Sequence, residues 1–380
     1  RPPRSTPKPS SAASDVYKRQ DIYMSVLFEK LVKKIKKFDA KKYSYSRNYI
    51  DGEVSRLSPY ISRGFISTFQ VFEILKLNFS TIKEIEKFVQ ELAWRDYFQL
   101  IWNEKNVEVS LKEYVSLNKK GIPIPILNAQ TSIKAIDNEI LNLYKNGYMH
   151  NHFRMYVASL ICNFSNCDFL TASKWMYYYL LDGDVGSNAL NWQWVSGASR
   201  NKKYYFNQEN LNKYSRVLQE NTFIDVDYNL LENLKAPESF TELTDFNLSC
   251  SLPNSDNFNL NNNKPLCIYN YYNIDPNWRK NIDSNRVLLL EPSIFRKYPV
   301  CDKAIDFLLK LSNEIPEIKI FTGEFSDLTK NFQNSIYYKQ HPLNIKYKGV
   351  EDSRDWLTSI EGYYPSFFSF WNKAKKELKY

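Results

Sequence analysis

The sequence predicts an α+β fold with two domains, a larger all-α domain followed by a small α/β domain. Three observations carry this prediction. Residues 21–216 repeat apolar side chains at intervals of three and four, which is the spacing of amphipathic helices. Residues 217–265 are polar and rich in Asn, as linkers often are. Residues 266–380 place short apolar runs on either side of a helical segment, a pattern typical of an α/β domain with partly parallel strands.

The elements follow in chain order. Residues 1–20 are basic and rich in Pro and Ser without an apolar core, so we expect a disordered or artefactual segment and exclude it from the fold. Helical periodicity is clearest in MSVLFEKLVKKIKKF, FISTFQVFEILKLNF and EKFVQELAWRDYFQLIW, and strand-like alternation is absent from this part. After the linker, LCIYNYY, RVLLLEP, IKIFTGEF and SIYYKQ predict strands, CDKAIDFLLKLSNEI predicts a helix, and SFFSFWNKAKKELKY predicts a basic amphipathic C-terminal helix.

The composition limits the classes of function. A net charge of +9 over 380 residues indicates a polyanionic partner, although a basic surface also serves solubility. The 16% of aromatic residues suits either stacking on bases or a ring cofactor, or a large aromatic core. Five cysteines, an odd number, indicate reduced thiols and a cytoplasmic protein. Cys162 and Cys167 lack nearby ligand partners, so we expect no metal site, and no apolar run is long enough to span a membrane.

The segment from Tyr45 to Ser67 places hydroxyl groups where a helix is expected to begin. Its sequence, YSRNYIDGEVSRLSPYISRGFIS, contains Ser55 and Ser58 on either side of Leu57. Hydroxyl groups beside free backbone N–H groups form a phosphate cradle, but they also cap helices. On these residues alone, helix capping is the better interpretation.

A second segment, Phe88–Phe98, places an acid and a base one helical turn apart. Glu91 and Arg95 have the i,i+4 spacing of a solvent-exposed ion pair, and Trp94 lies between them. Taken alone, this segment predicts a solvated helix face and a tryptophan in the core.

A third segment, Gly147–Trp194, is the most informative. In GYMHNHFRM, Asn151, Arg154 and Met155 lie within about one helical turn, so they can face one cavity. Arg154 is flanked by apolar residues and needs a carboxylate partner, for which Asp182 in LLDGD is the candidate. The DGDVGSN turn could also form Asx turns that close a helix, whereas a calcium loop would need a later bidentate Glu that is missing. Polar groups this concentrated among apolar residues indicate a large polar aromatic ligand.

From Tyr43 to about Tyr205 the sequence resembles the flavin-binding core of the photolyase/cryptochrome family. The resemblance implies an all-α FAD-binding domain of the photolyase type, FAD as the cofactor and UV-damaged DNA as the partner of a monomeric enzyme. The implied reaction is blue-light-driven repair of pyrimidine dimers by a deoxyribodipyrimidine photolyase-like lyase. The alternatives are a cryptochrome-like photoreceptor without repair activity and a nucleic-acid-binding module that has lost its flavin.

The resemblance also assigns roles to residues. It implies cofactor contacts for Tyr43, Ser55, Leu57, Ser58, Asn151, Arg154, Asp182, Asp184 and Asn188. It implies contacts to the dimer or its DNA for Glu91, Trp94, Arg95, Asn151, His152, Met155 and Trp194. Catalysis would involve Glu91, Asn188 and Trp192, and electron transfer to the flavin would pass through Trp192 and, by an altered route, Trp175.

The sequence departs from the family pattern at several places. Val54 stands where many members have Thr, Phe88 where Trp is common, and Phe169 at the usual second tryptophan of the electron path. Members usually begin with an α/β antenna domain, which we expect this chain to lack at its N-terminus. The C-terminal α/β segment is either a reduced or permuted counterpart of that domain or an unrelated module.

Overall fold

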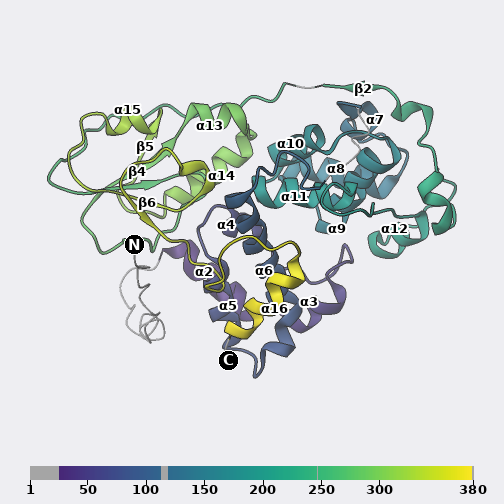
Figure 1. Cartoon of the computed structure of the whole chain (residues 1–380), viewed down its shortest axis with the longest axis horizontal. Helices are drawn as coiled ribbons and strands as arrows, with labels where there is room; N and C mark the ends of the chain where they lie inside the picture. Colours follow the sequence, from purple (N-terminus) through teal and green to yellow (C-terminus); the bar gives the residue numbers. More distant parts are fainter. Residues whose placement is uncertain (1–24, 113–118, 246, 379–380) are drawn as a thin grey trace.

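A computed structural model describes residues 25–112, 119–245 and 247–378. Residues 1–20, expected to be disordered or artefactual, lie outside the described residues. The fold combines many helices with a parallel sheet (Figure 1). Within the described residues, no helix is both long and apolar enough to cross a membrane.

The first part of the chain forms helices, as its periodicity predicts. These are α2 (Val26–Lys37), α3 (Ala40–Ser46), α4 (Ser58–Ser62), α5 (Thr68–Lys76), α6 (Ile82–Glu104), α7 (Ile124–Leu127), α8 (Lys134–Asn146), α9 (Asn151–Ser159), α10 (Phe169–Tyr179), α11 (Val185–Ser196) and α12 (Gln208–Ser215). Polar side chains cap several of them; Asp168, for example, accepts hydrogen bonds from the first backbone N–H groups of α10. One strand interrupts the series, because β1 (Ile122–Pro123) pairs with β2 (Leu243–Thr244).

The helices form two groups. Helices α2, α3, α5 and α6 pack together at the centre of the molecule, and α8, α9, α10 and α11 pack around a second core (Figure 1). Helix α11 also contacts α6, which joins the two groups. This junction matters for function because the segments singled out in the sequence analysis lie on both of its sides.

The C-terminal part contains a parallel sheet. Its strands are β3 (Leu266–Tyr269), β4 (Asn285–Leu290), β5 (Lys319–Thr322), β6 (Ile336–Lys339) and β7 (Val350–Asp352), in the order β5-β4-β3-β6-β7. Side chains alternate between two cores: Cys267 and Tyr269 face the large core with α14 (Asp302–Ser312), whereas Leu266 and Ile268 face α15 (Phe325–Thr329). A short helix, α13 (Pro292–Lys297), follows β4.

The polar segment before the sheet, residues 217–265, contains regular structure and contacts the sheet. It contains two short 3₁₀ helices, Tyr228–Asn233 and Glu238–Phe240, and it later runs along the edge strand β5. The backbone N–H of Asp256 donates to Ile320 at 2.9 Å, and the Asp256 carboxylate accepts from the N–H of Ile320 at 2.8 Å. The segment therefore pairs an edge that would otherwise expose its backbone groups.

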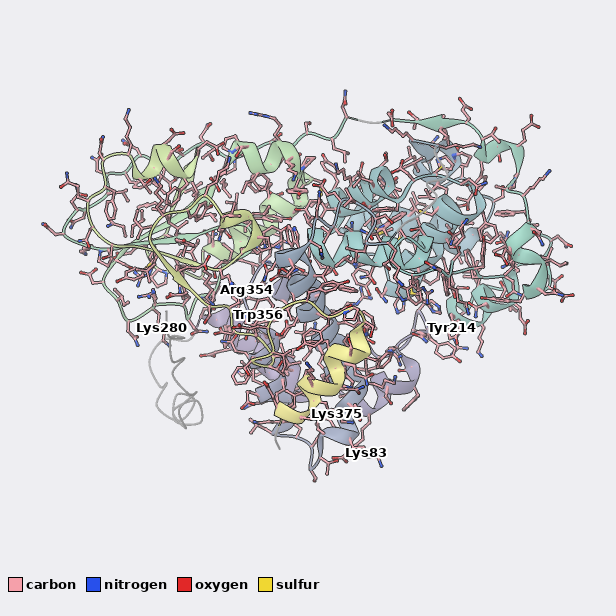
Figure 2. All side chains as sticks on the ribbon, viewed as in Figure 1. Lys83, Tyr214, Lys280, Arg354, Trp356 and Lys375 are labelled. Carbon is pink, nitrogen blue, oxygen red and sulfur yellow. The ribbon has the colours of Figure 1, made fainter. Side chains whose placement is uncertain are left out.

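After β7 the chain leaves the sheet and returns to the central helices. The last helix, α16 (Phe367–Glu377), has the predicted amphipathic pattern, but it packs against α6 rather than against the sheet, because its apolar face joins the core around Tyr97. We call residues 353–366, which lead to it, the C-terminal strap. Arg354 and Trp356 of the strap lie where the sheet meets the central helices (Figure 2).

Candidate functional site

An open cleft lies between α3, α6, α9 and the segment that leads into α4. Its volume is about 960 Å³, including the part open to solvent. The segments around Ser55, Glu91 and Arg154 therefore meet in space although they are far apart in the sequence. The residues that line the cleft are Tyr43, Arg47, Asn48, Val54, Ser55, Arg56, Ser58, Ile61, Phe88, Glu91, Leu92, Arg95, Tyr148, His150, Asn151, His152, Arg154 and Asp182.

The ion pair expected between Arg154 and Asp182 is present. The guanidinium Nη2 of Arg154 donates to the two carboxylate oxygens of Asp182 at 3.0 and 3.1 Å. Burial alone would raise the pKa of Asp182, but the charge of Arg154 and hydrogen bonds from Ser58 and Arg154 outweigh it, so the pKa lies below its ordinary value. The cleft therefore contains a fixed carboxylate that is ionised at neutral pH.

Glu91 does not pair with Arg95, although their spacing predicted an exposed pair. Its nearest cation is Arg47 of the loop after α3, at 3.8 Å, and its side chain is 42% exposed to the cleft. The surrounding walls raise the pKa of Glu91, and Arg47 only partly opposes this shift. Arg95 instead donates from Nη2 to the Ser62 hydroxyl at 2.7 Å, because the end of α4 lies closer to it than Glu91 does.

The two histidines at the start of α9 differ in their surroundings. His152 stacks on Tyr156 with ring centroids 4.6 Å apart, and its Nδ1 lies 3.1 Å from the Asn48 carbonyl oxygen. His150 is buried, and among the described residues its Nε2 has no hydrogen-bond partner within the usual distance and angle limits. Burial, together with nearby cationic groups, lowers the pKa of His150 to about 4. The imidazole of His150 is therefore neutral at pH 7.

Trp94 lies on α6 but outside the cleft lining. Its ring is stacked on Phe367 of α16, with centroids 3.8 Å apart and planes 7° apart. It also contacts Tyr97 and Phe98. One face of the ring expected to stack on a base is therefore already covered by a side chain of the protein.

Asp184 and Asn188 lie outside the cleft lining. The Asp184 carboxylate caps α11 through the N–H of Ser187 at 2.7 Å and accepts from Gln99 Nε2 at 2.7 Å. The Asn188 amide donates to the Ser173 carbonyl at 2.8 Å and lines a smaller hollow near Tyr298. Their side chains thus hold the DGD turn and the α10–α11 contact in place.

The remaining expected residues are also spread outside the lining. Leu57 is buried beneath the loop before α4, and Met155 packs against the core around α9. The guanidinium carbon of Arg200 lies 3.4 Å from the centroid of the Trp194 ring. Trp192 and Trp175 are buried in the same core, and Trp175 Nε1 donates to the Tyr144 hydroxyl at 3.2 Å.

Several cleft residues were missed by the sequence reasoning, among them Arg47, Arg56, Tyr148 and His150. Arg47 faces Glu91, and Arg56 lies over the ring of Tyr148 at 3.7 Å from its centroid. Arg56 stands inside the SRLSP segment, so its charge beside two serines was a usable signal. Nothing in the local sequence distinguishes Tyr148 from the many other tyrosines.

Comparison with known proteins points to one family. The family model described as the FAD binding domain of DNA photolyase matches residues 88–229. The deoxyribodipyrimidine photo-lyase of Agrobacterium fabrum is 29% identical over 160 residues, which cover 40% of this chain and 33% of the relative. That of Buchnera aphidicola is 26% identical over 258 residues, which cover 65% of this chain and 52% of the relative. The chain thus spans between a third and about half the length of these relatives.

Solved structures with similarity to the chain include both branches of this family. A cryptochrome from Synechocystis gives a TM-score of 0.43 at 22% identity, covering 49% of this chain and 42% of that chain. A bacterial class III photolyase from Agrobacterium tumefaciens gives 0.41 at 21% identity, covering 56% and 51%. Residues 88–229 thus resemble the FAD binding domain of DNA photolyase, and over part of its length the chain is similar to members of the photolyase/cryptochrome family.

Proposed function

We propose that the cleft binds FAD and that the chain uses it for light-driven repair of pyrimidine dimers in DNA. The observation that carries the proposal is the meeting of three separate polar segments in one cleft. Ser55 and Ser58 come from the segment that leads into α4, Glu91 from α6, and the Arg154–Asp182 pair from α9 and the turn before α11.

The residues present suit this cofactor. The cleft is a concave site lined by both polar and apolar side chains, as small-molecule sites are. Hydroxyl groups of Ser55 and Ser58, together with Arg56, suit a pyrophosphate. Tyr43 and Asn151 complete the set of proposed cofactor contacts that lie in the lining.

The remaining proposed roles are inferred from where each residue lies relative to the cleft. Bound FAD, once reduced and excited by blue light, supplies the electron that splits a dimer. Glu91, with its raised pKa and its exposure to the cleft, would form hydrogen bonds to a flipped-out base, while Arg95 and His152 orient the flanking DNA. Asp184 and Asn188 would act indirectly: Asp184 holds the DGD turn in place, and Asn188 holds α11 against α10.

For electron supply we propose Trp192 and then Trp175. Both are buried in one core, and Trp175 continues through its hydrogen bond to Tyr144, whose ring lies 4.6 Å from that of Tyr179. Photoreduction of bound FAD, followed by its visible absorbance under blue light with a thiol reductant, is expected to stop in Trp192→Phe and to slow in Trp175→Phe. Fast reduction in both variants would contradict this route.

One observation favours the cryptochrome-like alternative. Phe367 covers one face of Trp94, so a flipped dimer has less aromatic surface to stack on than the family motif implies. A photoreceptor would keep the flavin and lose the repair reaction. The two functions therefore differ in what happens to DNA, not in what the cleft binds.

The experiment begins with the absorption spectrum of the purified protein and continues with illumination of an oligonucleotide that contains one thymine dimer. We expect bound FAD and loss of the dimer in light only. Glu91→Gln is expected to keep FAD and to lower repair, whereas Arg154→Gln is expected to lower FAD content because it leaves Asp182 buried without its partner. Bound FAD without repair would support the photoreceptor, and a protein that takes up no FAD would refute both.

A further inference from the structure

Helix α2 has a basic face that plays no part in the site described above. Its apolar side is buried through Phe28, Leu31, Val32 and Ile35, which fix the orientation of the helix. The opposite side consists of four exposed lysines at positions i, i+3, i+4 and i+7. We call these residues the lysine stripe: Lys30, Lys33, Lys34 and Lys37.

The lysine stripe lacks local neutralisation. Within the part of the chain that the structure describes, none of its four ammonium groups forms an ion pair. The one acidic residue of α2 is Glu29, in the first turn. By contrast, Lys41 and Lys42 of the next helix pair with Glu84 and Glu53. Like charges at i,i+4 destabilise a helix, so the stripe has a cost that an anionic partner would offset.

The C-terminal end of the lysine stripe adjoins the cleft. Phe38, the residue after α2, packs against Tyr43 and Phe88, with ring centroids 5.8 and 4.8 Å apart, and both of these residues line the cleft. Arg47 and Arg56 belong to the same lining. Basic residues of the cleft and the lysines of α2 therefore lie on neighbouring elements.

We propose that the lysine stripe binds the sugar–phosphate backbone of DNA beside the cleft. The partner rests on the proposed function, since a dimer held in the cleft brings its flanking strand to this surface. The four lysines lie within eight residues and span about 10 Å along the helix axis. One DNA strand presents a phosphate every 3.4 Å or so of axial rise, so the stripe covers about three phosphates. Lysine side chains contact phosphates as point charges, which gives affinity without sequence preference.

The test compares two variants that remove the same charge. The stripe variant replaces Lys30, Lys33, Lys34 and Lys37 with Gln, which has nearly the same helix propensity as Lys. The control variant replaces four exposed lysines of the sheet region with Gln: Lys310, Lys330, Lys346 and Lys348. Binding of duplex oligonucleotides, with and without a thymine dimer, is measured by fluorescence anisotropy over a range of salt concentrations, and circular dichroism checks that both variants are folded.

We expect the stripe variant to bind both oligonucleotides more weakly by a similar factor. The slope of log affinity against log salt is expected to become shallower by about 0.9 for each phosphate that the variant no longer neutralises, hence by about 2 to 3. The control variant is expected to keep the slope of the unmodified protein. Equal slopes for the two variants would overturn the inference.

Failure of this inference is separable from failure of the proposed function. An unmodified protein that repairs the dimer, with a stripe variant of unchanged slope, refutes only the stripe. A protein that neither repairs nor prefers the dimer refutes the function, while the slopes on undamaged duplex still decide the stripe. Vesicles containing phosphatidylserine provide the last arm: if the stripe variant loses binding to vesicles but not to DNA, the partner is a lipid surface and the proposal is wrong.

Discussion

At the residue scale, the surroundings shift the pKa values of three ionisable side chains in the cleft in different directions. Burial and nearby cations hold His150 neutral, Arg154 keeps Asp182 ionised, and the cleft walls raise the pKa of Glu91. A site with an ionised carboxylate, a neutral imidazole and a carboxyl with a raised pKa offers both hydrogen-bond donors and acceptors near neutral pH.

The neutral state of His150 predicts a pH dependence of stability. Its pKa falls from 6.5 to about 4 on folding, so between these values the unfolded chain binds more protons and the free energy of unfolding decreases as the pH is lowered. The contribution of this residue between pH 7 and pH 5 is about 2 kcal/mol. Urea denaturation measures the free energy of unfolding of the unmodified protein and of His150→Gln at both pH values. Between pH 7 and pH 5 the unmodified protein is expected to lose about 2 kcal/mol more of this free energy than the variant.

Other titratable groups do not affect the comparison between the unmodified protein and His150→Gln. Burial raises the pKa of Asp96 to about 6, which acts in the opposite direction, but Asp96 is present in both proteins and its contribution cancels. A His150→Gln variant that loses as much stability as the unmodified protein between pH 7 and pH 5 would show that His150 is not held neutral by the fold.

Residue pairs also show what sequence reasoning can and cannot reach. Arg154 and Asp182 were paired correctly because an arginine among apolar neighbours requires a carboxylate, and few were available. Glu91 was paired wrongly because i,i+4 spacing describes one helix, whereas its true neighbour Arg47 comes from another segment. Local periodicity carries no information about which loop packs over a helix.

At the element scale, the helices and strands were largely predictable, but their contacts were not. The basic amphipathic pattern at the C-terminus correctly predicts α16. It does not show that the apolar face of α16 covers α6, because several buried surfaces could accept such a face. The covering of Trp94 by Phe367 is therefore a property of the tertiary structure alone.

Helix α16 provides an element-scale prediction with a control on the same helix. Phe367 is 3% exposed and stacks on Trp94, whereas Phe368 is 61% exposed. Phe367→Ala is expected to cost about 3–5 kcal/mol of unfolding free energy, as large-to-small changes in cores do. Phe368→Ala is expected to change it by less than about 0.5 kcal/mol. Urea denaturation followed by tryptophan fluorescence measures both, and similar costs would mean that α16 is only loosely attached.

At the scale of the whole molecule, the sheet and the helices are joined at a few tightly packed places. Arg63 is fully buried, donates to the Gly183 carbonyl of the DGD turn and lies 3.5 Å from the ring of Tyr271, which follows β3. The hydroxyl groups of Tyr177 and Tyr272 are 3.0 Å apart across the same junction. The turn that holds Asp182 is therefore supported from the sheet side as well as from the helical side.

Gly64 offers a direct test of this coupling. Its φ is +64°, and a Cβ at this position would lie 2.5 Å from the Tyr272 carbonyl oxygen, a backbone atom that cannot move aside alone. Gly362 has a φ of +83°, and no atom of the described residues lies within 4 Å of a Cβ built there, so Gly362→Ala carries only the strain of a left-handed residue, about 1–2 kcal/mol.

Gly64→Ala carries the same strain and must also separate the helices from the loop after β3. We expect it to cost more unfolding free energy than Gly362→Ala and to speed hydrogen exchange at the Ile274 amide, which donates to the Arg63 carbonyl at 2.9 Å. We also expect it to lower FAD retention, because the DGD turn loses its support from the sheet side. Equal costs for the two glycine variants, with unchanged exchange at Ile274, would show that the helical part holds the turn without the sheet.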